Sequence, residues 1–453
     1  MSAVIHKTND WYAQSFDLFE RSLNGEAQTK LHAIRRKAMA RFVELGFPTI
    51  RDEEWRFTNL LPVTKIPFAP VLSLDEEDSL KNDIRQFAFK DLDCHRLVFI
   101  DGHFSAGLSS IGTRQEGVRI GSLGTILKRT DDAVSEALAQ YARFDDDALA
   151  ALNTAFLKDG ACIVVPDGTA VDAPVHLLFL SSRRSQPFLS VPRILVLTGR
   201  ESRVSVIETY AGLDNNLYFT NSVTEMIVGE GAVVEHDKLQ QESEKAFHVG
   251  TMHIRQLAGS SYVANSISLG GSIVRNTVTA RLDDERCECT LNGLSLATGR
   301  QLVDNHTVID HAKPNCVSHE LYKSVLDGRA KGVFNGKIFV RKDAQKTDAK
   351  QTNKTLLLSD EATIDTKPQL EIFADDVKCT HGATVGQLDE EQIFYLRSRG
   401  VGLEQARDLL TYAFASDVIQ RIHIDPLRDQ LDQLLHARLR QGRIAYDNDE
   451  TTG

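Results

Sequence analysis

The sequence of 453 residues predicts a mainly β protein, a parallel β-helix flanked by helical N-terminal and C-terminal regions. Two observations predict this fold class. Apolar residues recur at helical spacing near both ends of the chain, but this periodicity is missing from about residue 161 to residue 386. In that middle stretch, a turn followed by alternating apolar positions recurs many times, which is typical of a stacked repeat.

The repeated unit starts at a Gly or Asp turn and contains strand-like sequence without a helix. The intervals between units cluster near one length or near half of it, which predicts two strands per coil. Alternation within each strand places one set of side chains inside the coil and the other in water. A β-sandwich or jelly roll stays open as an alternative, because these folds also have short, closely spaced strands. The first turn residues of the units are Asp167, Gly199, Gly229, Gly259, Asp283, Gly299, Asp327, Asp360 and Asp375.

The N-terminal region, residues 1–62, is predicted to be helical. A second helix is expected to start near Thr29 and to stop at Gly46. Residues 63–160 combine short apolar runs with a helical pattern in DDAVSEALAQYARF, and we expect a small α/β unit there. The first helix places four apolar residues near one face: Trp11, Phe16, Phe19 and Leu23.

The C-terminal region, residues 387–453, is predicted to hold three helices. DEEQIFYLRSRG forms a short helix that Gly400 ends, and a second helix spans 403–420. The third begins at Asp425, a capping residue followed by proline at the first helical position. The second helix carries apolar residues on one face: Ala406, Leu409, Leu410, Ala413, Phe414 and Val418.

Composition and charge exclude several classes of protein. The net charge of -11 predicts an acidic surface that repels phosphate backbones, which argues against a nucleic acid partner. No apolar run is long enough to span a membrane, and the N-terminal residues do not resemble a signal peptide. The six cysteines are too few for a disulfide framework in so long a chain, so we expect reduced thiols and a cytoplasmic protein.

Common catalytic and metal-binding motifs are missing from the sequence. It contains no P-loop, no GxGxxG, no HExxH, no GxSxG and no CxxC. GVFNGK, residues 332–337, ends in Gly–Lys but has the wrong spacing for a P-loop. We therefore expect a protein that does not hydrolyse nucleotide itself.

Two pairs of possible metal ligands remain. Cys287 and Cys289 in CEC share one face of a strand, where thiols either pack or share a metal. In DDVKCTHGATVG, Cys379 and His381 also share a face, and a thiolate with an imidazole suits iron or zinc. Two ligands do not complete a metal site. The residues alone leave two interpretations of this second pair open. The pair lies in an ordinary strand without binding a metal, or it forms half of a metal site that a second chain completes.

The segment NKTLLLSDEATIDTKPQLEIFADDVKCTHGATVGQLDEEQIFYLRSRGV, residues 353–401, resembles the C-terminal core of the SufD family, and the match continues on both sides of it. EEWRFTNL, residues 53–60, resembles the N-terminal motif of the family. SufD is a subunit of the SufBCD machine that assembles iron–sulfur clusters. The CTHGAT form is similar to SufD rather than to its paralogue SufB.

The resemblance implies a right-handed parallel β-helix and a non-catalytic scaffold subunit. It implies pairing with a SufB-like paralogue through the C-terminal end of the β-helix, and docking of a SufC-like ABC ATPase on the C-terminal helices. The apolar residues expected to dock the ATPase are Leu409, Leu410 and Phe414. A transient iron–sulfur cluster is expected at the SufB interface, with His381 and Cys379 as candidate ligands. The isolated chain is expected to hold no tight cofactor and either to stay monomeric or to form a homodimer.

Three other functions remain open at this point. A SufB-type paralogue would be the main cluster scaffold itself, with further cysteines near the last coil. A β-helix hydrolase or lyase acting on polysaccharide would be secreted and would carry an acidic groove. A purely structural partner subunit would use Cys379 and His381 only for packing.

Overall fold

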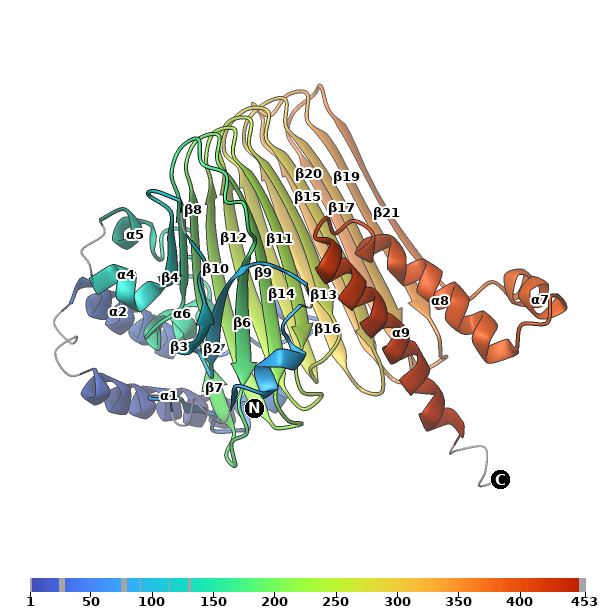
Figure 1. Cartoon of the computed structure of the whole chain (residues 1–453), viewed down its shortest axis with the longest axis horizontal. Coiled ribbons are helices and arrows are strands. Elements are labelled where there is room, and N and C mark those ends of the chain that lie inside the picture. Colours follow the sequence, from blue (N-terminus) through green and yellow to red (C-terminus); the bar gives the residue numbers. More distant parts are fainter. Residues whose placement is uncertain are drawn as a thin grey trace.

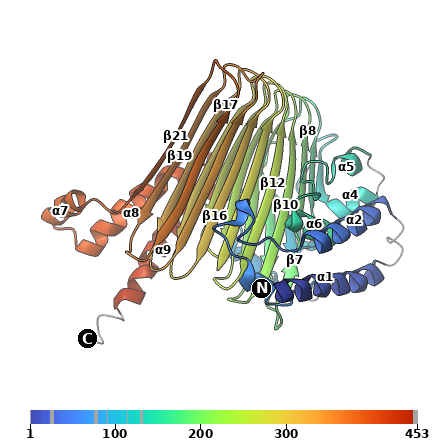
Figure 2. The same cartoon turned by 180° about the vertical axis from the view of Figure 1, so that it is seen from behind.

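The computed structural model describes residues 2–23, 29–74, 80–89, 91–113, 115–128 and 132–447. Two long sheets run side by side along the molecule, with helices at both ends (Figure 1; Figure 2). The predicted parallel β-helix is confirmed, and the β-sandwich is wrong. Among the described strands only two pairs are antiparallel, β2 (His95–Ile100) with β3 (His103–Ser110) and β4 (Arg119–Ser122) with β5 (Ala161–Val165).

One sheet has ten strands and the other has eleven. The ten-stranded sheet contains β2, β3, β6 (Val175–Ser181), β9 (Arg203–Gly212), β11 (Val233–Gln241), β13 (Ser261–Ser268), β15 (Glu288–Ala297), β17 (Val317–Leu326), β19 (Asp348–Leu357) and β21 (Lys378–Gly386). The eleven-stranded sheet contains β1 (Ala69–Pro70), β4, β5, β7 (Phe188–Ser190), β8 (Arg193–Thr198), β10 (Tyr218–Val228), β12 (Phe247–Gln256), β14 (Ile273–Leu282), β16 (Leu302–His311), β18 (Lys331–Val340) and β20 (Thr363–Ile372).

Successive coils stack in register, and each coil contributes one strand to each sheet. The ten-stranded sheet has the order β21-β19-β17-β15-β13-β11-β9-β6-β2-β3, so alternate strands of the chain are neighbours. From β9 onward, paired residues are between 26 positions apart, as for Phe247 and Ile273, and 32 positions apart, as for Lys331 and Thr363. This spacing confirms the predicted period and the two strands per coil.

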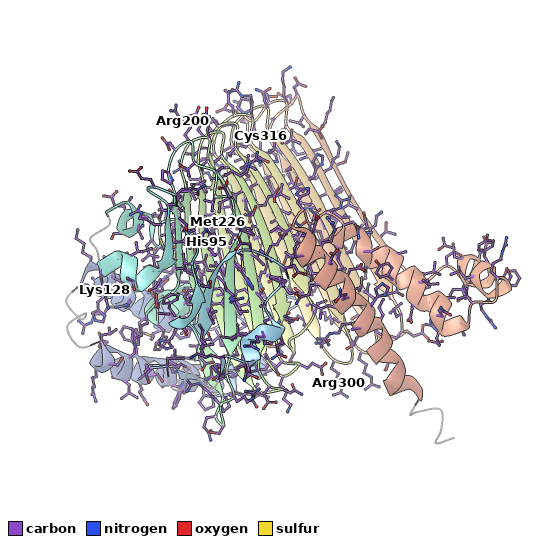
Figure 3. All side chains as sticks on the ribbon, viewed as in Figure 1. His95, Lys128, Arg200, Met226, Arg300 and Cys316 are labelled. Carbon is purple, nitrogen blue, oxygen red and sulfur yellow. The ribbon has the colours of Figure 1, made fainter. Side chains whose placement is uncertain are left out.

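A row of turns forms one long edge of the β-helix, and one residue of each turn has left-handed backbone angles. Their φ values lie between 51° and 65°. Each N–H donates to a carbonyl of the next coil, as Gly231 N does to Ala258 O (2.8 Å). Figure 3 labels Arg200 and Cys316, two neighbours of this row, along the same edge. The residues of the row are Gly168, Glu201, Gly231, Gly259, Arg286, Asn315 and Lys346.

The N-terminal helices cover the first coils. α1 (Ser2–Ser22) is followed by α2 (Lys30–Leu45), whose ends agree with the prediction. The Thr29 hydroxyl oxygen accepts a hydrogen bond from His32 N (3.2 Å), and Gly46 leaves the helix with a φ of 65°. Trp11 is exposed and Tyr12 is buried in its place, while the other predicted core residues of this helix are buried.

The strands of residues 63–160 join the β-helix rather than forming a sheet of their own. β2 and β3 extend the ten-stranded sheet, and β4 extends the eleven-stranded sheet. The helix predicted at 131–144 is shorter in the structure, because Ala139 has a φ of 61° and its N–H donates to Glu225. The short helices of this region are α3 (Leu61–Thr64), η4 (Asp83–Gln86), α4 (Leu123–Lys128), α5 (Asp132–Ala137) and α6 (Ala148–Ala155).

The segment EEWRFT, residues 53–58, binds the outer face of the eleven-stranded sheet, and we call this contact the N-terminal clamp. Arg275 donates to Asp304 (2.7 Å) and lies over the ring of Trp55 in the short helix η2 (Glu53–Trp55). The Thr58 hydroxyl also donates to Asp304. Burial alone would raise the pKa of Asp304, but Arg275 and His306 bring that pKa below its ordinary value. The centre of the clamp is thus a buried, charge-compensated contact of Thr58, Arg275 and Asp304.

The C-terminal helices are α7 (Glu390–Ser398), α8 (Leu403–Ile419) and α9 (Asp425–Asp447). α8 and α9 cover the outer face of the ten-stranded sheet, whereas α7 projects away from the β-helix (Figure 1; Figure 2). The residues of the predicted apolar face of α8 differ in burial: Ala406 and Val418 are buried, whereas Leu409 and Ala413 are exposed. The packed residues are Leu239, Ile267, Leu294 and Val325 from the sheet with Ala415, Val418, Ile419, Leu427, Leu431 and Leu435 from the helices.

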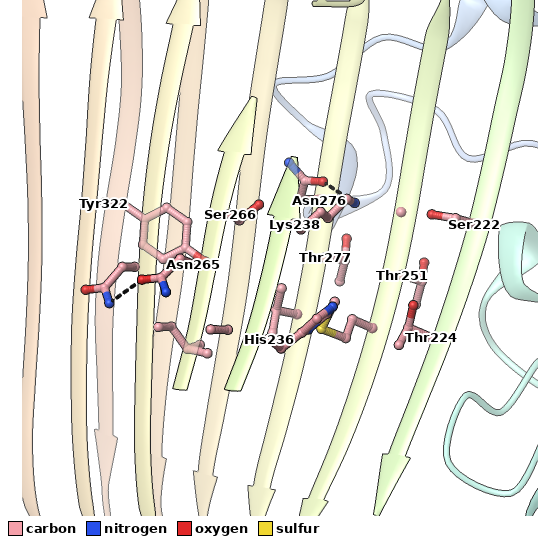
Figure 4. A pocket seen from close by; sticks show the side chains of 16 residues that line it. Ser222, Thr224, His236, Lys238, Thr251, Asn265, Ser266, Asn276, Thr277 and Tyr322 are labelled. Carbon is pink, nitrogen blue, oxygen red and sulfur yellow. Dashed lines mark hydrogen bonds between the residues drawn. The ribbon is translucent and has the colours of Figure 1, made fainter. Parts of the chain in front are cut away.

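The lumen of the β-helix is apolar near the row of turns and polar farther along the strands. Figure 4 shows Lys238 pointing to Asn276, whose side-chain oxygen accepts its hydrogen bond (2.9 Å). Lys238 also donates to His248 Nε2 (3.1 Å). Since lysine can only donate, the His248 proton lies on Nδ1, which is 2.7 Å from Glu242. Burial lowers the pKa of Lys238, and the carboxylates of Glu208 and Glu242 oppose this effect.

The first prediction concerns the row of turns. Gly259 has a φ of 65° and no atom within 4 Å of the position that a Cβ would occupy. Gly259→Ala should therefore lower the free energy of unfolding through the backbone alone, by about 1 kcal/mol. Gly121 has equally open surroundings but no left-handed φ, so Gly121→Ala is the matched control and should not destabilise. Equal effects of the two substitutions in urea unfolding would contradict the backbone explanation.

Candidate functional site

The C-terminal end of the β-helix is open. Within the described residues, β21 pairs only with β19, and β20 pairs only with β18. Each of the two strands therefore has one edge of backbone N–H and C=O groups without a strand neighbour. Such an edge is a ready template for another chain unless it is covered.

Cys379 and His381 lie on this last strand and face into the open end. Cys379 pairs with Ala349 and His381 pairs with Gln351, and both partners are buried inside the preceding coil. Neighbours in register in a parallel sheet have the same orientation, so the two candidate ligands share a face, as predicted, and this face is the inner one. Cys379 is half-buried and His381 is exposed, because no further coil covers them.

The surroundings of Cys379 favour the thiol over the thiolate. Its side chain packs against a small apolar cluster that includes Ile338, Val340 and Ala344. Burial raises the pKa of Cys379; a hydrogen bond with the Ala349 backbone opposes this effect in part, and the nearby Asp348 carboxylate adds to it. A metal ion bound here must displace the thiol proton, because the thiolate is the ligand.

One chain does not supply a complete metal site. In the part of the chain that the structure describes, no three His, Cys, Asp or Glu side chains are grouped so that they could hold a metal ion. Structural zinc sites take four protein ligands, and clusters of iron and sulfide are held by several cysteines. Cys379 and His381 are therefore at most half of a coordination shell.

A column of polar side chains continues from His381 into the lumen, and sequence reasoning missed it. Gln351 pairs in register with His381 and with Glu320, and its side-chain nitrogen donates to Glu320 (2.6 Å). Gly336 leaves room for Gln351, since a Cβ there would lie 2.3 Å from the Gln351 amide nitrogen. Burial raises the pKa of Glu320 to about 7. Only the register of the coils brings these residues together, so a linear motif does not reveal them.

Two cavities of the described chain lie away from this strand. One lies in the lumen among the polar residues of Figure 4, and its volume of ≈ 20 Å³ is enough for about one water molecule. The other, of ≈ 570 Å³, lies at the N-terminal clamp and is lined by Ile50, Arg51, Glu53, Arg56, Phe57, Asn335 and Lys367. Neither of these two adjoins Cys379 or His381.

The predicted docking residues on α8 differ in exposure. Leu409 is 44% exposed, whereas Leu410 and Phe414 are half-buried. Phe414 already contacts its own chain, because Lys323 lies over its ring and donates to its carbonyl oxygen (3.0 Å). α7 adds Phe394, which is 74% exposed, and Tyr395 beside it. These two side chains were not predicted, although the apolar pair FY in a polar helix was a visible signal.

Comparison with known protein families covers nearly the whole chain. Residues 179–414 match a family model described as SUF system FeS cluster assembly, SufBD core domain. Residues 6–177 match the SufBD protein N-terminal region. The chain belongs to the SufBD family. The resemblance found in the sequence is thereby confirmed for this family.

Several relatives of this SufBD-family chain are similar over most of their length. A SufBD family protein of Synechocystis is 34% identical over 404 residues, which are 87% of this chain and 88% of the relative. SufD of Escherichia coli is 29% identical over 419 residues, 91% of this chain and 94% of the relative. The chloroplastic protein ABCI7 of Arabidopsis thaliana is 29% identical over 418 residues, 90% and 86% of the two chains. None of the described helices is long and apolar enough to cross a lipid bilayer.

The second prediction uses the raised pKa of Glu320. Its folded-state pKa is about 7, above the ordinary 4.5, so the folded protein keeps a proton that the unfolded chain loses between these values. Stability must then fall as pH rises through this window, by about 3 kcal/mol in total. Glu320→Gln removes the charge and keeps an acceptor for Gln351. The midpoint temperature of thermal unfolding of this variant should equal that of the wild type at pH 4 and exceed it at pH 8. The same difference in midpoint temperature at both pH values would contradict the prediction.

Proposed function

We propose that this chain is a SufD-type scaffold subunit that assists iron–sulfur cluster assembly at an interface with a SufB-type paralogue. One observation carries the proposal: two metal-binding side chains face into the open end of the last coil, on a strand with an unpaired edge. A second β-helix joined at this end would cover the edge and add the missing ligands. The cluster is the substrate of this assembly, not a resident cofactor of the chain.

The roles of the two side chains follow from their chemistry. His381 is exposed and offers an imidazole nitrogen, which binds iron in its neutral form. Cys379 lies deeper and has a raised pKa, so it contributes a thiolate only when a metal replaces its proton. We therefore assign the principal ligand role to His381 and a secondary one to Cys379.

ATP would be used by a SufC-type ATPase bound to the C-terminal helices. The apolar side chains of α7 and α8 support this part of the proposal, because Phe394, Tyr395 and Leu409 are all exposed. Lys323 on β17 forms an ion pair with Asp417 on α8 (2.7 Å), so movement of α8 would act directly on the β-helix.

The third prediction tests His381. His381→Ala should change the free energy of unfolding by no more than about 0.5 kcal/mol, because the side chain is exposed. The SufB-type partner should still co-purify. The rate of cluster assembly should fall roughly tenfold or more, because a side chain that binds iron directly is lost. The measurement is growth under iron limitation of a strain that depends on this pathway alone, together with the iron content of the purified complex.

Two controls accompany this substitution. Cys379→Ala should have a smaller effect than His381→Ala. Lys378→Ala removes a neighbouring exposed side chain that points away from the lumen and should leave assembly unchanged. Normal growth and iron content of the His381→Ala strain would leave the chain as a purely structural partner subunit. Assembly of clusters by this chain without a SufB-type partner would instead identify it as the main scaffold.

The fourth prediction tests the helical docking surface. Leu409→Glu combined with Phe394→Glu should abolish co-purification of a SufC-type ATPase without unfolding the chain, since both side chains are exposed. Leu18→Glu introduces the same charge at an exposed apolar position on α1 and should have no effect on co-purification. Phe414→Glu should lower stability as well, because Phe414 packs beneath Lys323. Retention of the ATPase by the double variant would end the docking proposal.

A further inference from the structure

Cys287 and Cys316 lie side by side at the row of turns, one coil apart. Cys287 immediately precedes β15 and Cys316 immediately precedes β17, and Glu288 and Val317 are paired in register. The N–H of Val317 donates to Cys287 O (2.9 Å), so the two cysteines occupy equivalent places in successive coils. Both are buried free thiols, and Figure 3 shows Cys316 at this edge of the molecule.

The two thiols share one hydrogen-bonding environment. Each sulfur lies 3.2 Å from the same oxygen, Asp284 O. A thiol–thiol hydrogen bond is the largest cause that lowers the pKa of Cys287 and raises the pKa of Cys316. The two thiols are therefore coupled: when one loses its proton, the other keeps its own and donates to the thiolate.

The sequence placed Cys287 together with Cys289, but the structure gives it a different neighbour. Cys289 is two residues along the same strand, roughly 7 Å away. Equivalent residues of adjacent parallel strands are only about 4.8 Å apart, within the range of Cα separations that disulfides span. Cys316 is therefore the cysteine within bonding reach of Cys287.

The position also gives access to a small reagent. The turn that covers the pair, residues 284–286, is exposed, although the sulfurs themselves are buried. Arg286 in this turn holds a φ of 56°, a conformation that costs free energy in a residue with a side chain. A molecule the size of hydrogen peroxide needs only a small opening of this turn to reach Cys287.

We propose that Cys287 and Cys316 are a peroxide-sensitive thiol pair that closes to a disulfide between two coils. The Cys287 thiolate attacks one oxygen of hydrogen peroxide, the O–O bond breaks, and a sulfenic acid forms with release of hydroxide, which takes up a proton as water. The Cys316 sulfur then attacks the Cys287 sulfur, the S–S bond forms, and the sulfenic oxygen leaves as water. Two thiols and one peroxide give one disulfide and two waters.

The fifth prediction is the outcome of peroxide treatment of the full chain. The protein is reduced, freed of reductant, treated with hydrogen peroxide, unfolded in the presence of iodoacetamide, and mapped by mass spectrometry. Alkylation of Cys287 and of Cys316 should fall together. One cross-linked peptide should appear, with the summed mass of the two reduced peptides less two hydrogen atoms. Cys162 and Cys289 are buried without such a partner, and burial raises the pKa of each, so both should remain alkylated.

Single substitutions distinguish a disulfide between Cys287 and Cys316 from other products of oxidation. Cys316→Ser removes the second thiol, so a dimedone adduct of Cys287 sulfenic acid should accumulate severalfold above the wild type. Cys289→Ser should leave the cross-linked peptide unchanged. Circular dichroism before and after treatment confirms that the folded chain is being oxidised. The proposal is overturned if both thiols stay alkylated when the more exposed Cys94 and Cys379 are oxidised, or if Cys287 pairs with Cys289.

Discussion

Backbone hydrogen bonds between successive coils hold the β-helix together, and they also determine where it can end. An interior strand such as β15 pairs with β13 on one side and β17 on the other. At the first coils the sheets end in β3 and β4, which also have one strand neighbour each, but inward side chains there, such as Leu97 and Phe99, are buried. At the last coil β21 is mostly exposed, because no further element of the described chain covers the lumen there. The position of the candidate site follows from this asymmetry, because ligands facing the lumen become accessible only where the lumen is open.

The lumen imposes a second constraint, since it contains charges that water cannot reach. Lys238 lies among Glu208, Glu242 and His248, and each group is compensated by a partner of opposite charge or by a hydrogen bond. Removing one partner would leave an uncompensated buried charge, which costs several kcal/mol. This cost favours one register of the coils over its neighbours, because a shift by one residue would turn each inward side chain to the outer face. The polar lumen thus favours the register of the coils in which Gln351 on β19 is paired with His381 on β21.

Sequence periodicity predicted the parts of this fold that depend on local spacing. The coil period and the common face of Cys379 and His381 follow from repeats of about thirty and of two residues, and the ends of α2 follow from Thr29 and Gly46, which flank it. Local spacing does not determine how distant segments meet. Which apolar residues of α8 pack in the chain, and which stay exposed as Leu409 does, depends on its contacts with β15 and β17. Nothing local indicates that β2, in residues 63–160, pairs with β6 of the β-helix.

The N-terminal clamp and α8 hold the β-helix at its middle coils, from opposite faces. The clamp contacts β14 and β16 through Arg275 and Asp304, and Lys323 ties α8 to β17. The clamp also reaches the last coil, because Glu53 forms an ion pair with Lys367 on β20 (3.1 Å). Lys331 on β18 donates to Phe57 O (3.1 Å), so residues 53–58 span the outer face from β14 to β20. Since β20 and β21 form the same coil, a shift of this N-terminal segment would be transmitted to the strand that carries His381.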